Sequence, residues 1–171
     1  LLTFKGEFKE AESMAKNLAG RNLDGDNLSV NEMRKKLVKE AEKKAEQSIE
    51  EECLFGDVPL VVFVPEINEG IIGIIAGHLT EKYKVPSICF TTSTKDETIL
   101  KGSGRSVEGV HLKALLDKVS NDMLRYGGHP GAAGLSIKKE NLQIFREHLK
   151  ENIGDFSVED KPLEYDLEIK E

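Results

Sequence analysis

The sequence predicts an α/β fold that follows a long amphipathic helix. Four short segments rich in apolar and β-branched residues, at 60–64, 87–91, 99–106 and 133–137, have the length and composition of strands. Segments with apolar residues at helical spacing lie between and after them. A chain of 171 residues with 39% hydrophobic residues is long enough for one domain of ordinary size plus extra elements.

The first 55 residues predict helices and no strand. Residues 5–19 have apolar side chains near the helical period, and Ser29 with Glu32 forms a capping box that predicts a second helix over 31–52. The narrow stripe on this second helix lacks strict a/d alternation, which favours a solvated helix resting one edge on a domain over a coiled coil. Its members are Val30, Met33, Leu37, Ala41, Ala45 and Ile49.

The helix that follows the first strand is unusually apolar. Residues 68–79 read NEGIIGIIAGHL, and Asn68 is a good N-cap for them. Gly73 and Gly77 lie four residues apart, so we expect a neighbouring backbone to approach this helix closely. His78 near the helix end is typical of a surface or satisfied core histidine.

The second half of the chain continues the alternation of helices and strands. Leucines at core spacing predict a helix from about His111 to Leu124, and a last amphipathic helix is expected at about 139–152. Residues 162–169 alternate polar and apolar side chains like a strand, which suggests that another domain follows.

Composition and charge narrow the classes of protein to which this chain can belong. The net charge of −7 excludes a wholly basic nucleic-acid binder but leaves room for a local basic groove. No apolar run approaches the roughly 20 residues that span a bilayer, so no membrane partner is expected. Cys53 and Cys89 are far apart in sequence and indicate reduced thiols in a cytoplasmic protein. The start of the chain lacks Met and a signal peptide, which suggests an excised piece of a longer protein.

The stretch YGGHPGAAG at 126–134 has almost no side-chain bulk. We expect a loop whose backbone N–H groups, including those of Gly127 and Gly128, can form an anion-binding concavity. His129 would be the polar side chain at its mouth.

A second glycine-punctuated segment, at 102–106, reads GSGRS. The guanidinium of Arg105 can bind phosphate oxygens bidentately, while Ser103, Ser106 and free N–H groups such as that of Gly104 can complete a phosphate cradle. If both segments sit at strand ends on one sheet edge, they converge on a phosphodiester backbone. The four histidines are isolated, without an Asp partner at metal-ligand spacing, so we expect no metal site in this chain.

Three segments in this order, NEGIIGIIAGHL, KGSGRS and YGGHPGAAGLS, resemble the DHH-associated domain of the DHH phosphoesterase superfamily, in its form in RecJ-like single-stranded-DNA-specific exonucleases. The resemblance covers about residues 58–152. Ile67 departs from the family pattern, which often has an aromatic residue there, whereas Asn68 fits it. The resemblance implies a mixed β-sheet flanked by helices.

The resemblance also implies a division of labour in a larger enzyme. A DHH lobe would bind manganese or magnesium and activate water for attack on a phosphodiester, while this lobe would hold single-stranded DNA in 5′→3′ degradation during repair and recombination. The DHH triplet is absent here, so this chain alone is expected to be inactive and to carry no certain catalytic residue. The residues implied in phosphate binding are Ser103, Gly104, Arg105, Ser106, Gly127, Gly128 and His129, the last also a possible auxiliary to the metals.

The implied organisation has three parts. Residues 1–55 would connect to a missing DHH domain, 56–153 would form the DHH-associated domain, and 154–171 would lead to a missing OB-fold domain. Alternatives are a lobe of an oligonucleotide or cyclic-dinucleotide phosphodiesterase, a tRNA-binding module like the C-terminal domain of alanyl-tRNA synthetase, and an oligomerisation domain built on the helix at 29–52. The phosphodiesterases usually carry a three-glycine GGGH loop, whereas Tyr126 precedes Gly127 here.

Overall fold

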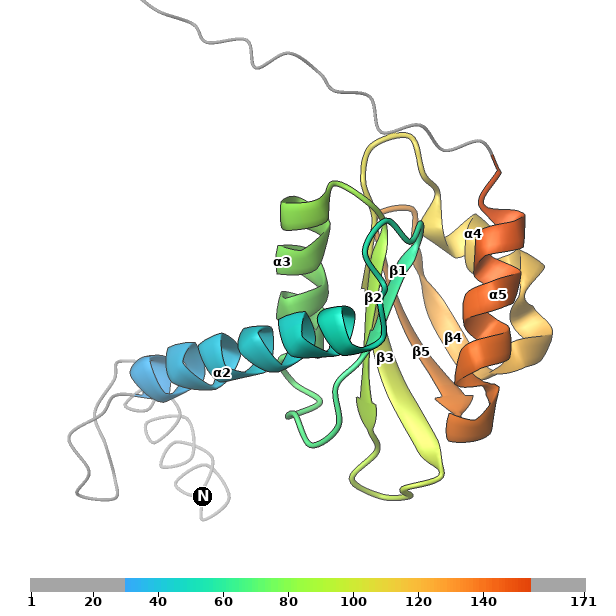
Figure 1. Ribbon diagram of the computed structural model, residues 1–171. Helices are drawn as coiled ribbons and strands as arrows, with labels where there is room; N and C mark the ends of the chain where they lie inside the picture. Colours follow the sequence, from blue (N-terminus) through green and yellow to red (C-terminus); the bar gives the residue numbers. More distant parts are fainter. Residues whose placement is uncertain (1–29, 155–171) are drawn as a thin grey trace, which may run out of the picture.

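The computed structural model describes residues 30–154 and confirms the α/β fold, with a five-stranded mixed sheet between two layers of helices (Figure 1). The predicted helix at 5–19, the cap at Ser29 and the strand-like segment at 162–169 lie outside the described residues. The elements are α2 (Val30–Glu51), β1 (Leu60–Phe63), α3 (Ile72–Tyr83), β2 (Ser87–Thr92), β3 (Ile99–Arg105), α4 (Leu112–Lys118), the 3-10 helix η1 (Ser120–Asp122), β4 (Met123–His129), β5 (Ala132–Lys138), the 3-10 helix η2 (Lys139–Asn141) and α5 (Leu142–Asn152).

The strand order is β1-β2-β3-β5-β4. β1 and β2 are parallel because α3 connects them as a crossover, and the other neighbours are antiparallel. Successive residues of a strand face opposite sides of the sheet, so each strand contributes to two separate surfaces. α2 and α3 lie on one side of the sheet, and α4 and α5 lie on the other (Figure 1).

The long helix α2 is largely solvated and rests one edge on the domain, as the sequence predicts. Its last turns pack on the domain through Ala41, Ala45 and Ile49, which are buried. Met33 and Leu37, one turn or more earlier, are 44% and 48% exposed. Of the stripe residues from Met33 to Ile49, those in the C-terminal half therefore join the core. Within residues 30–154 no helix is both long and apolar enough to cross a membrane.

The core on the other side of the sheet contains two buried phenylalanine rings. Phe90 of β2 and Phe145 of α5 are both fully buried and meet edge to face, with ring centroids 5.7 Å apart. Leu142, Phe145 and Leu149 face this core, as the spacing predicted. These contacts hold α5 against the side of the sheet opposite to α3.

The predicted glycine loop is a β-hairpin. Residues 123–129 and 132–138 form β4 and β5, and only Pro130 and Gly131 make the turn. A Cβ atom on Gly128 would lie 2.3 Å from the carbonyl oxygen of Ala132, so only glycine lets the two strands approach this closely. Backbone pairing with β5 thus takes the place of the predicted loop.

The helix predicted from His111 to Leu124 is also too long. α4 ends at Lys118, η1 follows, and Met123 already pairs with Ile137 in the sheet. The pairing of β4 with β5 overrides the helical spacing of the leucines. The N-cap expected at Asn68 is wrong as well, because α3 begins only at Ile72, while the Asn68 side chain accepts a hydrogen bond from the Gly70 N–H at 2.7 Å.

The two edge strands of the sheet differ in how accessible they are to other molecules. On β1, the Ser48 hydroxyl donates to the Phe63 carbonyl oxygen at 3.0 Å, and the Arg146 guanidinium donates to the Val61 carbonyl oxygen at 3.1 Å. Arg146 is 6% exposed and also pairs with Glu52 at the end of α2. β4 forms the opposite edge, and its residues Arg125, Gly127 and His129 are exposed. The accessible edge is therefore the one that carries the glycine-rich motif.

Both cysteines are free, and they differ in environment. Burial raises the pKa of the Cys89 thiol to about 12, whereas Cys53 is exposed. Because the thiolate is the reactive form, we expect a thiol reagent at pH 8 to label one cysteine in the folded chain and two after denaturation. Cys53→Ser should remove the fast reaction, and fast labelling that persisted in that variant would contradict this environment for Cys89.

An imidazole on α5 makes stability depend on pH. His148 Nδ1 lies 2.7 Å from Asp122 Oδ2, and this hydrogen bond, helped by the carboxylate charge, raises the pKa of His148 above its usual 6.5. A raised folded pKa stabilises the fold fully below the unfolded pKa, and the gain is lost as pH rises through the folded pKa. The difference in unfolding free energy between the native chain and His148→Gln, from urea titrations at pH 5.5 and 8.5, should therefore be larger at pH 5.5. An equal difference at both pH values would contradict this role.

Candidate nucleic-acid interface

Strand register places the two glycine-rich motifs in the same rows of the sheet. Ser103 on β3 pairs with Gly134 on β5, which pairs with Gly127 on β4. In the next row of this face, Arg105 pairs with Ala132, which pairs with His129. The motifs do not meet as loops at strand ends, as expected from sequence. They meet as neighbouring strands, with β5 between them.

These residues lie on the side of the sheet that carries α3. α3 packs on β2 and β3, while Gly127 and Gly134 farther along the sheet are exposed. Nothing stands over these two glycines, since a Cβ atom on either would have no neighbour within 4 Å. We call this surface the open face. It comprises Lys101, Ser103, Arg105, Arg125, Gly127, His129, Ala132, Gly134 and Lys138.

Arg105 stands at the border between α3 and the open face. Its Nη1 donates to the Gly104 carbonyl oxygen at 2.9 Å and to Ser103 Oγ at 3.3 Å. These two bonds hold the side chain in place and leave its other N–H groups available, since a guanidinium has five. None of the salt bridges described within residues 30–154 involves Arg105. The arrangement provides a fixed fork for an external anion.

The glycines of α3 make room for this arginine. We expected Gly73 and Gly77 to admit a neighbouring backbone, but the group that comes close is the Arg105 side chain. A Cβ atom on Gly73 would lie 3.1 Å from Arg105 Nη2 and 3.1 Å from Ser103 Oγ, whereas one on Gly77 would lie 4.0 Å from Arg105 Cγ. The missing side chain at Gly73 is therefore part of the site.

Gly73→Ala should displace the Arg105 guanidinium, and if Arg105 binds phosphate that binding should weaken. The new methyl group is within the range where the neighbour must move. Affinity for a single-stranded oligonucleotide, measured by fluorescence anisotropy, should fall by several-fold, with the melting temperature unchanged or raised because alanine favours the helix. Gly77→Ala is the matched control and should leave the affinity unchanged. Equal losses in both variants would contradict the role of Gly73.

His129 is oriented by the hairpin turn. The Gly131 N–H donates to His129 Nδ1 at 3.3 Å, which requires that this ring nitrogen be the acceptor. The proton of the neutral imidazole is then on Nε2, which can donate a hydrogen bond to an anion. His129 is exposed, at the end of β4 in the row of Arg105.

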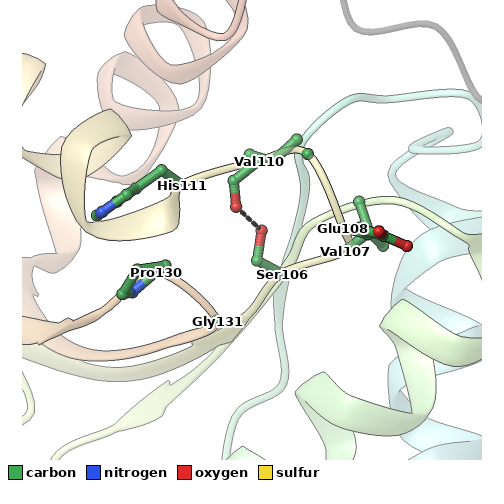
Figure 2. Close-up of a pocket in the computed structure, with 8 residues that line it drawn as sticks. Ser106, Val107, Glu108, Val110, His111, Pro130 and Gly131 are labelled. Atoms are coloured by element: carbon green, nitrogen blue, oxygen red, sulfur yellow. Dashed lines mark hydrogen bonds between the residues drawn. The ribbon is translucent and has the colours of Figure 1, made fainter.

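Three of the residues predicted in phosphate binding lie elsewhere. Gly104 is buried on the opposite side of the sheet, where a Cβ atom would lie 2.8 Å from Leu112 Cδ2. Gly128 also alternates to that side and serves the close pairing of the hairpin. Ser106 follows β3, and its hydroxyl donates to the Val110 carbonyl oxygen at 2.7 Å (Figure 2). The structure therefore brings Ser103, Arg105, Gly127 and His129 together and separates the other three from them.

Three cationic side chains of the open face were not predicted. Lys101 lies two residues before Ser103, Arg125 lies two residues before Gly127, and Lys138 lies beyond Ser136 on β5. The signal available in the sequence was the period of two in a strand, which puts residues i and i+2 on one face. Treating 126–134 as a loop concealed that signal for Arg125.

The described residues do not fit a catalytic metal. Within residues 30–154 no three His, Cys, Asp or Glu side chains are grouped so that they could hold an ion. Mg²⁺ and Mn²⁺ need several oxygen or nitrogen ligands, and the open face offers N–H donors instead. No chemical step through a metal is assigned to these residues.

Comparison with known proteins identifies the family of the domain. The family model for the DHHA1 domain matches residues 57–155. The single-stranded-DNA-specific exonuclease RecJ of Haemophilus influenzae is 33% identical over 114 residues, which are 63% of this chain and 20% of that protein. RecJ of Escherichia coli is 33% identical over 101 residues, which are 57% of this chain and 17% of that protein. The chain thus spans about a fifth of the length of these relatives.

A solved structure shows the same fold. RecJ from Thermus thermophilus in complex with Mg²⁺ superposes with a TM-score of 0.60 at 23% identity, over 74% of this chain and 19% of that one. At this identity the likeness concerns the fold alone.

Proposed function

Because the chain belongs to the DHHA1 domain family, we propose that its open face holds single-stranded DNA for a RecJ-like exonuclease. The observation that carries the proposal is the floor of Gly127 and Gly134 beside Arg105, with Lys101, Arg125 and His129 around it. A floor without side chains lets a sugar–phosphate backbone approach the sheet, and the surrounding N–H donors bind its oxygens. These contacts are independent of base sequence.

The proposal also explains how an acidic chain can bind DNA. The net charge is −7, but none of the salt bridges described for residues 30–154 places a carboxylate on Arg105, Lys101 or Arg125. Phosphate binding depends on a local group of cations that releases counterions, and it therefore weakens with salt. The local charge of the open face, and not the total charge, would set the affinity.

We assign the hydrolytic step to a DHH lobe with manganese or magnesium, which would act on the strand that this face presents. In this division of labour His129 and Arg105 orient the phosphodiester, and the DHH lobe supplies the metals and the attacking water. We propose that residues 1–55 connect to that lobe, and that 154–171 lead to an OB-fold domain.

The direct test is competition binding with the 171-residue chain. A fluorescent single-stranded oligonucleotide should be displaced by unlabelled single-stranded DNA, and more weakly by duplex DNA, tRNA or a cyclic dinucleotide. Stronger displacement by tRNA or by the dinucleotide would favour the tRNA-binding or phosphodiesterase alternative and overturn the proposal. Light scattering on the same sample tests the oligomerisation alternative.

A further inference from the structure

A pocket of about 410 Å³ opens at the end of the sheet, one residue beyond the row of Arg105 and His129 (Figure 2). One wall is the segment from Ser106 to His111, and the other is the turn of Pro130 and Gly131. Its volume is within the about 300–1,000 Å³ typical of sites for small ligands. The proposed phosphate contacts do not use this pocket.

Ser106 connects the two walls. Its backbone N–H donates to the Gly131 carbonyl oxygen at 3.0 Å and joins the walls, whereas its hydroxyl donates to the Val110 carbonyl oxygen at 2.7 Å and holds the first wall in its shape. The Leu112 N–H donates to the Pro130 carbonyl oxygen at 2.9 Å and joins the walls a second time. The pocket is therefore held open by hydrogen bonds in the free protein.

The lining suits a flat ring with polar edges. Val107, Val110 and Pro130 provide apolar contact, and His111 is exposed at the end where Pro130 lies (Figure 2). The His111 ring is fixed because its Nδ1 accepts the Ala114 N–H at 3.1 Å. An exposed imidazole held in one orientation can stack on a base. Glu108 lies at the other end of the pocket and points away from Ser106 (Figure 2).

We infer that this pocket receives a nucleobase of the strand whose phosphates lie on the open face. Arg105 immediately precedes Ser106, and His129 immediately precedes Pro130, so the phosphate donors and the pocket walls belong to the same two chain segments. A nucleotide joins a phosphate to an aromatic ring, so its phosphate could contact Arg105 and His129 while its base enters the adjacent pocket. The inference rests on the proposed function, and it makes Ser106 a positioning residue for the pocket and not a phosphate ligand.

The experiment compares a short oligothymidylate with an abasic strand that has the same number of phosphates. The 171-residue chain should bind the strand with bases at least about 5-fold more tightly, since stacking adds to phosphate binding. Ser106→Ala should bring this ratio close to one, and Ser106→Thr, which keeps the hydroxyl, should restore it. Arg105→Ala should weaken the binding of both strands and preserve the ratio.

The outcomes separate the two proposals. A ratio near one in the native chain, or an unchanged ratio in Ser106→Ala, overturns the pocket and leaves the open face standing. Failure of the native chain to bind either strand overturns both. If Ser106→Ala does not fold, amide chemical shifts of the native chain decide: Val107 and Val110 should shift with the thymidylate strand and not with the abasic strand, and equal shifts with both overturn the pocket.

Discussion

Arg105→Ala should lower the affinity of the chain for single-stranded DNA by about 10- to 150-fold. A hydrogen bond to a charged group contributes about 1.5–3 kcal/mol, and Arg105 is held by Ser103 and Gly104 with N–H groups left for a phosphate. Loss of one phosphate contact on a single strand should also reduce the slope of log affinity against log salt by about 0.7. Anisotropy titrations at several salt concentrations measure both quantities.

Arg34→Ala is the matched control, because it removes the same charge from an exposed position on α2, far along the chain from the open face. Its affinity should stay near that of the native chain. The same loss in both variants would indicate a general charge effect. An unchanged affinity and salt slope in Arg105→Ala would remove Arg105 from the interface.

Gly102→Ala should destabilise the fold by about 1–3 kcal/mol, the usual cost of overpacking a core. Gly102 lies on β3 between Lys101 and Ser103, but it faces the aromatic core. A Cβ atom there would lie 2.4 Å from Cε1 of Phe90, which is fully buried against Phe145. Thermal unfolding should show a melting temperature lower by about 2–4 °C for each kcal/mol.

Gly134→Ala provides the control on the neighbouring strand. Gly134 lies on the open face, and a Cβ atom there would have no neighbour within 4 Å, so its melting temperature should not fall. Comparable losses in the two variants would contradict the assignment of opposite faces to Gly102 and Gly134. An unchanged melting temperature in Gly134→Ala would also show that the fold itself does not require glycine at this position of the open face.

Local patterns in the sequence were sufficient for most elements. The apolar run at 60–64 and the helix at 139–152 depend on side-chain character within a few residues, and both appear in the structure close to the predicted bounds. The same is true of α2, whose stripe also indicated that much of its surface is solvated. Each of these elements has one dominant signal and no competing one.

The predictions for 111–124 and 126–134 were wrong because strand pairing between residues distant in the chain decides the structure there. Leu115, Leu116 and Met123 have helical spacing, yet Met123 joins β4 because Ile137 lies opposite it. Glycines and Pro130 at 126–134 suggested a loop, since their propensities favour turns. Cross-strand hydrogen bonds with β5 outweigh these local preferences for all but the two residues of the turn.

By itself the sequence determined the α/β class, the solvated helix and the residue types that can bind phosphate, because these follow from composition and short-range spacing. Only the tertiary structure decided which of those residues share a surface. The register of β3, β5 and β4 puts Arg105 in a row with His129, while the pleat turns Gly104 and Gly128 to the other side. It also decided that Gly73 accommodates Arg105 and that the Ser106 backbone N–H joins two walls of a pocket. Such contacts join residues far apart in the chain, and no local pattern specifies them.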